Sequence, residues 1–140
     1  MAQWRNDANG EIIKLDENAI SRHIVGAALE VHTVLGGPGL LESVYEEALA
    51  WELAQRNLHV ERQKLFRIAY KGTGLASPLR LDMLVNDLVI VECKAVTQFN
   101  PIFQAQALTY LRVTGLRLAL IINFGSAVLR TGIKRVVNGL

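Results

Sequence analysis

The stretch PLRLDMLVNDLVIVECK, residues 78–94, decides the fold of this chain. In its first half, 79–85, apolar side chains recur at every second position, and Pro78 marks the start of this pattern. The apolar run 88–91 in its second half is typical of a strand buried on both faces. Asn86-Asp87 is a turn signal between the two halves. The stretch therefore predicts two β-strands joined by a tight turn.

Three charged residues stand out within these strands: Asp82, Glu92 and Lys94. Glu92 and Lys94 share a face because strand side chains repeat every two residues. Two carboxylates can hold a divalent cation, and a nearby ammonium can orient a water or offset phosphate charge. Charged strand residues usually just face solvent. At the end of a buried strand, however, they are costly unless they are paired or bind a metal, so the pattern indicates metal-assisted phosphodiester cleavage.

The length of the turn decides whether Asp82 and Glu92 can cooperate. A two-residue loop, Asn86-Asp87, would pair Asp82 with Val91 and place the two carboxylates on opposite faces of the sheet. A three-residue loop, 86–88, would pair Asp82 directly with Glu92. A working site requires this odd loop or a bulge. We therefore predict the odd register.

The remaining chain predicts an α/β fold with a mixed sheet flanked by helices. Residues 1–16 are expected to form a flexible N-terminal arm, and residues 17–140 a single domain. The expected elements are a helix from about residue 18, a helix after the glycine-rich break at 36–39, strands at 60–70, 79–85 and 88–94, a helix at 101–114, a strand at 118–122, and a closing strand or strand pair at 127–137.

Composition narrows the classes of protein that this chain can represent. Half of its 140 residues are hydrophobic (51%), yet no apolar stretch reaches the roughly 18 residues that a membrane span needs. The polar start lacks the apolar core of a signal peptide. The single cysteine, Cys93, excludes an internal disulfide and suits the reducing cytoplasm. A net charge of +2 does not by itself indicate nucleic-acid binding. Basic residues do concentrate after Glu61, however, and could form a local basic face.

A motif upstream of the sheet carries a family resemblance. The segment GLLESVY, residues 39–45, is similar to the G-x-x-E-x-x-Y signature of the GxxExxY proteins, a family placed within the PD-(D/E)XK nuclease superfamily. The resemblance extends over nearly the whole chain, from about Ile20 to Leu140. It implies a restriction-endonuclease-like fold with the core order α-β-β-β-α-β. Further matching segments are 80–82, 92–94, 106–110 and 132–138.

The resemblance also implies roles for individual residues. Asp82 and Glu92 would bind Mg²⁺ or Mn²⁺, and Lys94 would position or activate the attacking water. Glu42 would match the extra acidic residue that many members add to the metal shell. Gln106 resembles a glutamine on the helix after the core strands, and is expected to be catalytic with the others. Three more residues are expected to line the site: Arg80, Tyr45 and Tyr110.

Plainer interpretations of these residues stay open. Glu42 could be an ordinary first-turn helix acid, which the helix dipole favours. Tyr45 could be a core aromatic residue. Gln106 and Tyr110 lie four apart on one helix face and could form a buried polar pair.

The chain departs from the family pattern at two positions. Phe103 stands where family members often have a histidine, three residues before Gln106, and this loss is expected to weaken activity if the histidine serves phosphate or proton transfer. Cys93 occupies the middle of the Glu92–Lys94 triplet, where an aliphatic residue is usual. This change should be neutral, because the position faces away from Glu92 and Lys94.

Three functions follow as hypotheses. The first is a nuclease that uses Mg²⁺ or Mn²⁺ to hydrolyse phosphodiester bonds in DNA. It is expected in the cytoplasm, with nucleic acid and not a membrane as its partner. The second is a catalytically weak or inactive nuclease-fold module that binds nucleic acid or a protein partner, which the small size and modest charge favour. The third is a homo-oligomer, such as a homodimer, that packs through the apolar first helix and has a purely structural acidic cluster.

Overall fold

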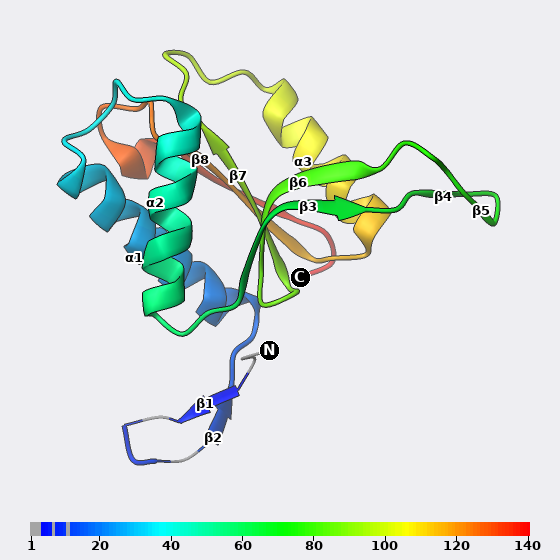
Figure 1. Ribbon diagram of the computed structural model, residues 1–140, viewed down its shortest axis with the longest axis horizontal. Coiled ribbons are helices and arrows are strands. Elements are labelled where there is room, and N and C mark those ends of the chain that lie inside the picture. Colours follow the sequence, from blue (N-terminus) through cyan, green and yellow to red (C-terminus); the bar gives the residue numbers. More distant parts are fainter. Residues whose placement is uncertain (1–3, 7, 11) are drawn as a thin grey trace.

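The structure is a computed structural model that describes residues 4–6, 8–10 and 12–140 of the chain. Figure 1 shows a central sheet with α1 and α2 against one side, α3 against the other, and two small hairpins that project from the body. The helices are α1 (Glu17–Val34), α2 (Glu42–Gln55), α3 (Ile102–Thr114) and the short 3-10 helix η1 (Leu129–Gly132). The strands are β1 (Trp4–Asn6), β2 (Ile12–Lys14), β3 (Val60–Phe66), β4 (Ala69–Tyr70), β5 (Thr73–Gly74), β6 (Leu79–Val85), β7 (Val89–Lys94), β8 (Leu118–Asn123) and β9 (Ile133–Val137).

The main sheet has five strands in the order β3-β6-β7-β8-β9. Strands β7 and β8 are parallel, and the other neighbours are antiparallel. A parallel pair needs a long crossover connection, which α3 supplies between β7 and β8. The sheet is therefore mixed, as the sequence predicts, and the run α2-β3-β6-β7-α3-β8 follows the expected core order α-β-β-β-α-β.

Each face of the sheet has its own hydrophobic core. One core lies between the sheet and the helices α1 and α2, and includes the fully buried Leu49, Val91 and Ile122. The other lies under α3 and includes Leu111 and Ile121. Alternate residues of β8 thus enter opposite cores, which explains why the strand is apolar throughout.

Residues at the ends of α1 and α3 explain where these two helices begin and end. Asp16 caps α1, because its carboxylate accepts a hydrogen bond of 2.8 Å from the backbone N–H of Ala19. The helix predicted from residue 101 begins at Ile102 in the structure, one residue later. The Asn100 side chain accepts a hydrogen bond from the Ile102 N–H at 3.0 Å. Gly115 ends α3 in the left-handed conformation (φ 76°), as predicted.

Three segments differ in detail from the expected elements. The strand predicted at 60–70 ends at Phe66, which pairs with Leu79, and the small hairpin β4–β5 follows. The closing segment forms η1 and then one strand, β9. Within the predicted arm 1–16, β1 pairs with β2, whereas residues 1–3, 7 and 11 lie outside the described residues. No helix in the described part of the chain is long and apolar enough to cross a membrane.

Candidate active site

The turn between β6 and β7 has the odd register that the chemistry requires. Val85 pairs with Val89, so three residues form the loop, and the Leu88 N–H donates back to the Val85 carbonyl at 3.0 Å. Asn86 and Asp87 both adopt the left-handed conformation, with φ of 51° and 55°. Side chains that tolerate this conformation, Asn and Asp above all, allow such a turn. The prediction of an odd register is confirmed.

Asp82 and Glu92 lie where β6 and β7 separate. The backbone pairing between the two strands ends at Met83 and Val91. Beyond that point, the Asp82 N–H donates to Glu92 Oε2 at 2.8 Å, and the Cys93 N–H donates to Asp82 Oδ2 at 3.0 Å. Each carboxylate therefore takes the place of a backbone acceptor on the neighbouring strand. This exchange holds the two side chains in fixed positions beside each other.

Burial gives the carboxylates unusual electrostatics. Glu92 is only 8% exposed. This burial, reinforced by the charge of Asp82, raises the pKa of Glu92 to about 8, while the Asp82 N–H and the positive charge of Lys94 act in the opposite direction. Burial also raises the pKa of Asp82, against the hydrogen bond from the Cys93 N–H. Two acids that resist ionisation side by side form a place where a bound cation is favourable.

Lys94 reaches the same place from the end of β7. Its ammonium lies 4.5 Å from the centroid of the Phe103 ring on α3, within the range of a cation–π interaction. Phe103 in turn meets Phe99 edge to face, with ring centroids 5.4 Å apart. No ion pair joins Lys94 to an acidic side chain within the described residues. The aromatic ring therefore orients the ammonium and leaves its N–H groups for other partners.

Glu42 is the first residue of α2 and belongs to the same electrostatic group. Burial raises its pKa first, and the charge of Asp82 raises it further, whereas Lys94 lowers it. Leu41, at the cap position, makes no side-chain hydrogen bond to the helix. Glu42 thus lies close enough to the strand residues to sense their charges, in addition to its place in the first turn of a helix.

Tyr45 lies in the core, which agrees with the plainer interpretation of this residue. Its side chain is fully buried and stacks on Phe124 with ring centroids 4.8 Å apart. Its hydroxyl donates to the Gly37 carbonyl at 2.7 Å and accepts from the Leu40 N–H at 3.1 Å. Tyr45 therefore fixes the loop that leads into α2, and acts on Glu42 only by placing the start of that helix.

The other predicted residues differ in their burial and in their electrostatic coupling to the carboxylates. Tyr110 is half-buried, and burial followed by the charges of Glu92 and Asp82 raises its pKa, so it lies near them. Arg80 is exposed, and its charge lowers the pKa of Asp82. Gln106 is exposed on α3, and its side chain makes no hydrogen bond to a described residue.

Sequence reasoning missed Glu46, a buried acid one turn after Glu42. It is 6% exposed, and Arg62 Nη2 and Gln63 Nε2 each donate to it at 2.9 Å. Its charge raises the pKa of Asp82. The signal was available, because Glu42 and Glu46 are four residues apart and so share a helix face.

Gln63 is strained at the position opposite Asp82. It has a positive φ of 50°, which is uncommon for a residue other than glycine. The pairing of β3 with β6 includes Arg62 with Met83 and Lys64 with Leu81, but skips Gln63 and Asp82. Strand β6 thus loses regular pairing on both sides at Asp82. Strain of this kind often accompanies functional sites.

The described side chains suit a divalent cation only in part. No group of three His, Cys, Asp or Glu side chains in the described ranges is close enough together to hold a metal ion, so the predicted set of Asp82, Glu92 and Glu42 is not assembled. Asp82 and Glu92 nevertheless each keep one oxygen without a hydrogen bond to a described residue. Mg²⁺ is commonly bound by one or two carboxylates, with waters and substrate phosphates as further ligands. The pair therefore fits Mg²⁺ or Mn²⁺, with Glu42 outside the direct ligands.

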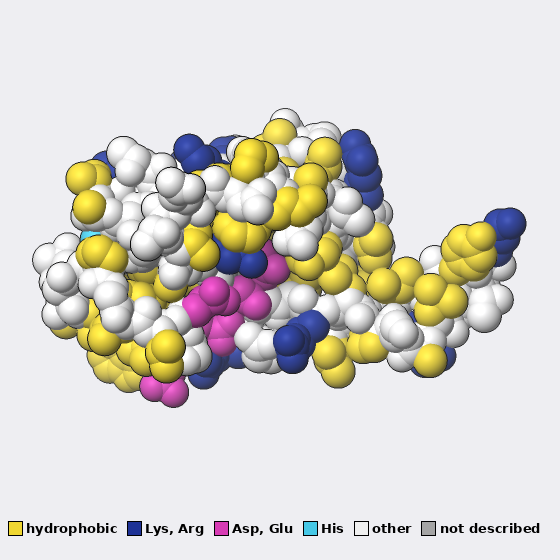
Figure 2. All heavy atoms as spheres, turned by 90° about the horizontal axis from the view of Figure 1, so that it is seen from above, with side chains coloured by type: hydrophobic (Ala, Val, Ile, Leu, Met, Phe, Trp, Pro, Cys, Tyr) yellow, Lys and Arg dark blue, Asp and Glu magenta, His cyan; other side chains and the backbone are white. Residues whose placement is uncertain are grey.

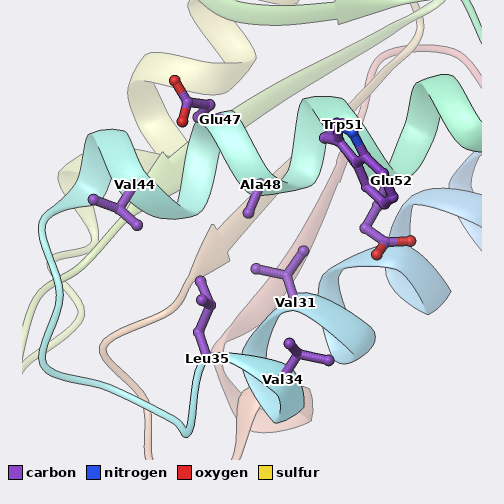
Figure 3. A pocket seen from close by; sticks show the side chains of 8 residues that line it. All are labelled: Val31, Val34, Leu35, Val44, Glu47, Ala48, Trp51 and Glu52. Atoms are coloured by element: carbon purple, nitrogen blue, oxygen red, sulfur yellow. The ribbon is translucent and has the colours of Figure 1, made fainter.

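The surface of the protein carries a group of acidic side chains (Figure 2). In the face shown in Figure 2, Asp and Glu side chains gather near the middle, directly beside Lys or Arg side chains and a group of hydrophobic side chains. A separate apolar cavity of about 570 Å³ lies between α1 and α2 and contains none of the residues above. Figure 3 shows its lining: Val31, Val34, Leu35, Val44, Glu47, Ala48, Trp51 and Glu52.

Comparison with known proteins gives one match. The family model described as the PD-(D/E)XK nuclease superfamily matches residues 18–136, which is most of the chain and includes the Asp82, Glu92 and Lys94 positions. No curated protein and no solved structure matches the chain.

Proposed function

Because this chain belongs to the PD-(D/E)XK nuclease superfamily, we propose that it is a divalent-metal-dependent nuclease that hydrolyses phosphodiester bonds in DNA. The observation that carries the proposal is a pair of hydrogen bonds where β6 and β7 separate: the Asp82 N–H donates to the Glu92 carboxylate, and the Cys93 N–H donates to the Asp82 carboxylate. That arrangement fixes the buried carboxylate of Glu92 beside the half-buried carboxylate of Asp82, and the charge of Lys94 acts on both. A purely structural pair would not need to keep two mutually repelling acids together.

The residues divide the chemistry between them. Mg²⁺ or Mn²⁺ held by Asp82 and Glu92 would polarise a phosphate oxygen and lower the pKa of bound water. Lys94 orients the attacking water and offsets charge that develops on the phosphate. Phe103 keeps the ammonium in place. Its ring is neutral, so the positive charge of Lys94 is not cancelled, whereas a carboxylate partner would cancel it. Glu42 adds negative charge at the edge of the site, where it can accept a hydrogen bond from water.

Cation binding and ionisation of Glu92 support each other. With a pKa of about 8, Glu92 is mostly protonated at neutral pH in the absence of metal. A divalent cation favours the ionised form, so it binds as the proton leaves.

We also assign the chain to the GxxExxY proteins within the superfamily. Support comes from the motif at residues 39–45, whose two defining side chains have distinct places. Glu42 lies within the electrostatic reach of Asp82, and Tyr45 holds the preceding loop through its hydroxyl. We further propose that residues 17–140 act as one domain in the cytoplasm, where the free, buried thiol of Cys93 suits a reducing environment.

Cleavage of a mixed panel of substrates tests the nuclease proposal. Linear, nicked, branched and single-stranded DNA and RNA are incubated with the wild type, Glu92→Gln and Lys94→Ala, in Mg²⁺, Mn²⁺ or chelator. We expect metal-dependent cutting of DNA by the wild type and loss of at least about 100-fold in both variants. Equal cutting by wild type and variants would show that the activity comes from a contaminant.

A second candidate is a nuclease-fold module with little turnover that binds a protein partner. The apolar cavity between α1 and α2 favours it, because Val34 and Trp51 at its wall are 69% and 61% exposed. Exposed apolar groups that gather in one place often mark interaction surfaces. Metal binding without cleavage of any substrate in the panel would favour this candidate, with a second copy of the chain as one partner to examine.

A further inference from the structure

A hairpin leaves the main sheet on the strand that carries Asp82. Between β3 and β6 the chain forms β4 and β5, which pair only with each other, and Figure 1 shows the hairpin projecting well beyond the body. Every residue from 69 to 78 is exposed. A hairpin that buries nothing contributes little to the core, so its shape needs another explanation.

The hairpin, residues 67–78, has a defined shape in spite of its exposure. Lys71 and Gly72 at its tip both have positive φ, 49° and 78°, the conformation of a tight hairpin turn. The Leu75 N–H donates to the Ile68 carbonyl at 2.8 Å, which continues the pairing toward the base. A Cβ at Gly74 would collide with the Arg67 guanidinium, so Arg67 lies closely against the backbone of the opposite strand.

The charge of this segment is one-sided. Residues 67–80 contain Arg67, Lys71 and Arg80 and no acidic residue. These three positive charges exceed the net charge of the whole chain, which is +2, so the remainder is slightly negative. No ion pair to a described acidic residue uses any of the three. The hairpin and its base therefore carry a net positive charge, whereas basic and acidic residues nearly balance in the rest of the chain.

An aromatic ring accompanies the charges at the tip. Tyr70 is 59% exposed, and the Lys71 ammonium lies 5.5 Å from the centroid of its ring. Figure 2 shows Lys or Arg and hydrophobic side chains together at the projecting end. Exposed basic groups beside an exposed aromatic ring suit a nucleic-acid strand, since they can contact phosphates and stack on a base or sugar.

We propose that the hairpin of residues 67–78 is a nucleic-acid-binding arm that grips the DNA substrate at a distance from the cleaved bond. The proposal rests on the function proposed above, because it names DNA as the occupant. Arg67 and Lys71 contact phosphates, and Tyr70 packs against the strand between them. The arm supplies the affinity that a small domain of low net charge otherwise lacks.

The reach of the arm sets the length of substrate that it can sense. Lys71 precedes Asp82 by eleven residues, and a strand rises roughly 3.3 Å per residue, so the tip lies at most about 36 Å from the carboxylates. This corresponds to about ten base pairs at 3.4 Å each. The arm therefore lies within reach of duplexes that extend up to about one helical turn beyond the site, and we expect it to act least on the shortest ones.

Binding of labelled duplexes tests the arm without any need for cleavage. Fluorescence anisotropy is measured in chelator, with duplexes of 30 and 8 base pairs, over a range of salt concentrations. For Arg67→Ala combined with Lys71→Ala, we expect roughly tenfold weaker binding of the long duplex and a salt slope smaller by about 1.8. Binding of the short duplex should weaken much less than binding of the long duplex. Tyr70→Ala should weaken binding of the long duplex without changing the slope.

Two control proteins separate the arm from charge in general. Arg22→Ala combined with Arg130→Ala removes the same charge from exposed positions on α1 and η1, and should bind the long duplex as the wild type does. Arg67→Lys combined with Lys71→Arg keeps the charge and should retain most of the binding.

Several results would overturn the proposal. Wild-type protein that does not bind the long duplex would exclude the arm as a DNA contact. Equal losses in the arm variant and the Arg22/Arg130 control would show a general charge effect. A change of oligomeric state in the arm variant, seen by sedimentation, with unchanged DNA binding would show that the hairpin contacts protein. The anisotropy experiment measures no cleavage, so it tests DNA binding through the arm even if the nuclease proposal fails. A separate cleavage assay on the short duplex tests the nuclease proposal by itself.

Discussion

The backbone N–H of Asp82 donates to the carboxylate of Glu92, and the carboxylate of Asp82 accepts from the residue that follows Glu92. The two acids are therefore built into the hydrogen bonding of strands β6 and β7. A change at either one affects both the chemistry of the site and the fold around it. Substitutions that keep the hydrogen bonds but remove the charge are the most informative.

Stability without metal should fall as the pH rises from about 4.5 to about 8. Glu92 ionises near 4.5 when unfolded and near 8 when folded, because burial and Asp82 oppose its charge. Within this window the folded state holds a proton that the unfolded state has lost, so the stabilisation is complete below 4.5 and lost as the pH passes 8. Urea unfolding at pH 5.5, 6.5 and 8 should show a decrease on the order of a few kcal/mol.

Glu92→Gln provides the matched control for that pH dependence. The amide can still accept from the Asp82 N–H through its oxygen, but it does not ionise. We expect its stability to change less over the same pH range, and to equal or exceed that of the wild type at pH 8. A steep pH dependence that survives in Glu92→Gln would assign the titration to another group.

Binding of Mg²⁺ should release close to one proton per site at pH 7. Glu92 is mostly protonated there when the site is empty, and it must ionise to bind a cation. Isothermal titration calorimetry in buffers of different ionisation enthalpy measures the number of protons released. At pH 9 the release should fall to about a tenth of a proton, because most of Glu92 is already ionised there. Proton release that is the same at both pH values would show that Glu92 does not take part.

The sequence predicted the fold order because its cues are local. The alternating strand 79–85, the buried run 88–91 and the helix after Asn100 all depend on neighbouring residues, and all three elements are present. The strand predicted at 60–70 was too long for a non-local reason. Its partner β6 begins at Leu79, opposite Phe66, so residues after Phe66 have no strand in the main sheet to pair with.

The candidate site was predictable only where chemistry constrained it. The odd turn followed from requiring Asp82 and Glu92 to meet, since turn residues alone allowed both registers. The burial of Tyr45 could not be read from motif spacing, which does not distinguish a residue that acts from one that holds a loop. The spacing of Glu46 from Glu42 could have indicated a shared helix face, but its partner Gln63 takes a strained conformation that nothing in its own sequence indicates.

Phe103→Leu should lower kcat and leave the fold intact. The substitution keeps an apolar side chain but removes the ring that lies 4.5 Å from the Lys94 ammonium. Cation–π interactions contribute about 0.5–2 kcal/mol, so we expect a loss of roughly 2-fold to 30-fold in kcat. Phe103→Tyr, which keeps the ring, is the control and should retain most of the activity. An equal loss in both variants would mean that the ring does not act through Lys94.

Glu46→Ala should reduce both stability and activity, because it removes the shared partner of Arg62 and Gln63. Its side chain is 7% exposed, whereas that of Arg62 is 38% exposed and can recover hydration. We therefore expect a loss of about 1–3 kcal/mol, below that of a fully buried ion pair. Urea unfolding measures the stability, and the pH profile of cleavage should shift to lower pH, since the charge of Glu46 raises the pKa of Asp82. Glu47→Ala, at the exposed neighbouring position, should change neither quantity.

Tyr45→Phe should destabilise the protein by about 1–3 kcal/mol, because the Leu40 N–H and the Gly37 carbonyl lose their partner inside the molecule. The ring would still stack on Phe124, so the core should remain packed. Loosening of the loop also frees the start of α2, and we expect cleavage to fall more steeply on warming than in the wild type. Thermal unfolding and cleavage rates between 20 and 45 °C measure the two effects. Tyr70→Phe, on the exposed hairpin, should leave stability unchanged. Wild-type stability in Tyr45→Phe would show that water replaces the hydroxyl without loss, and that the second half of the G-x-x-E-x-x-Y motif serves another purpose.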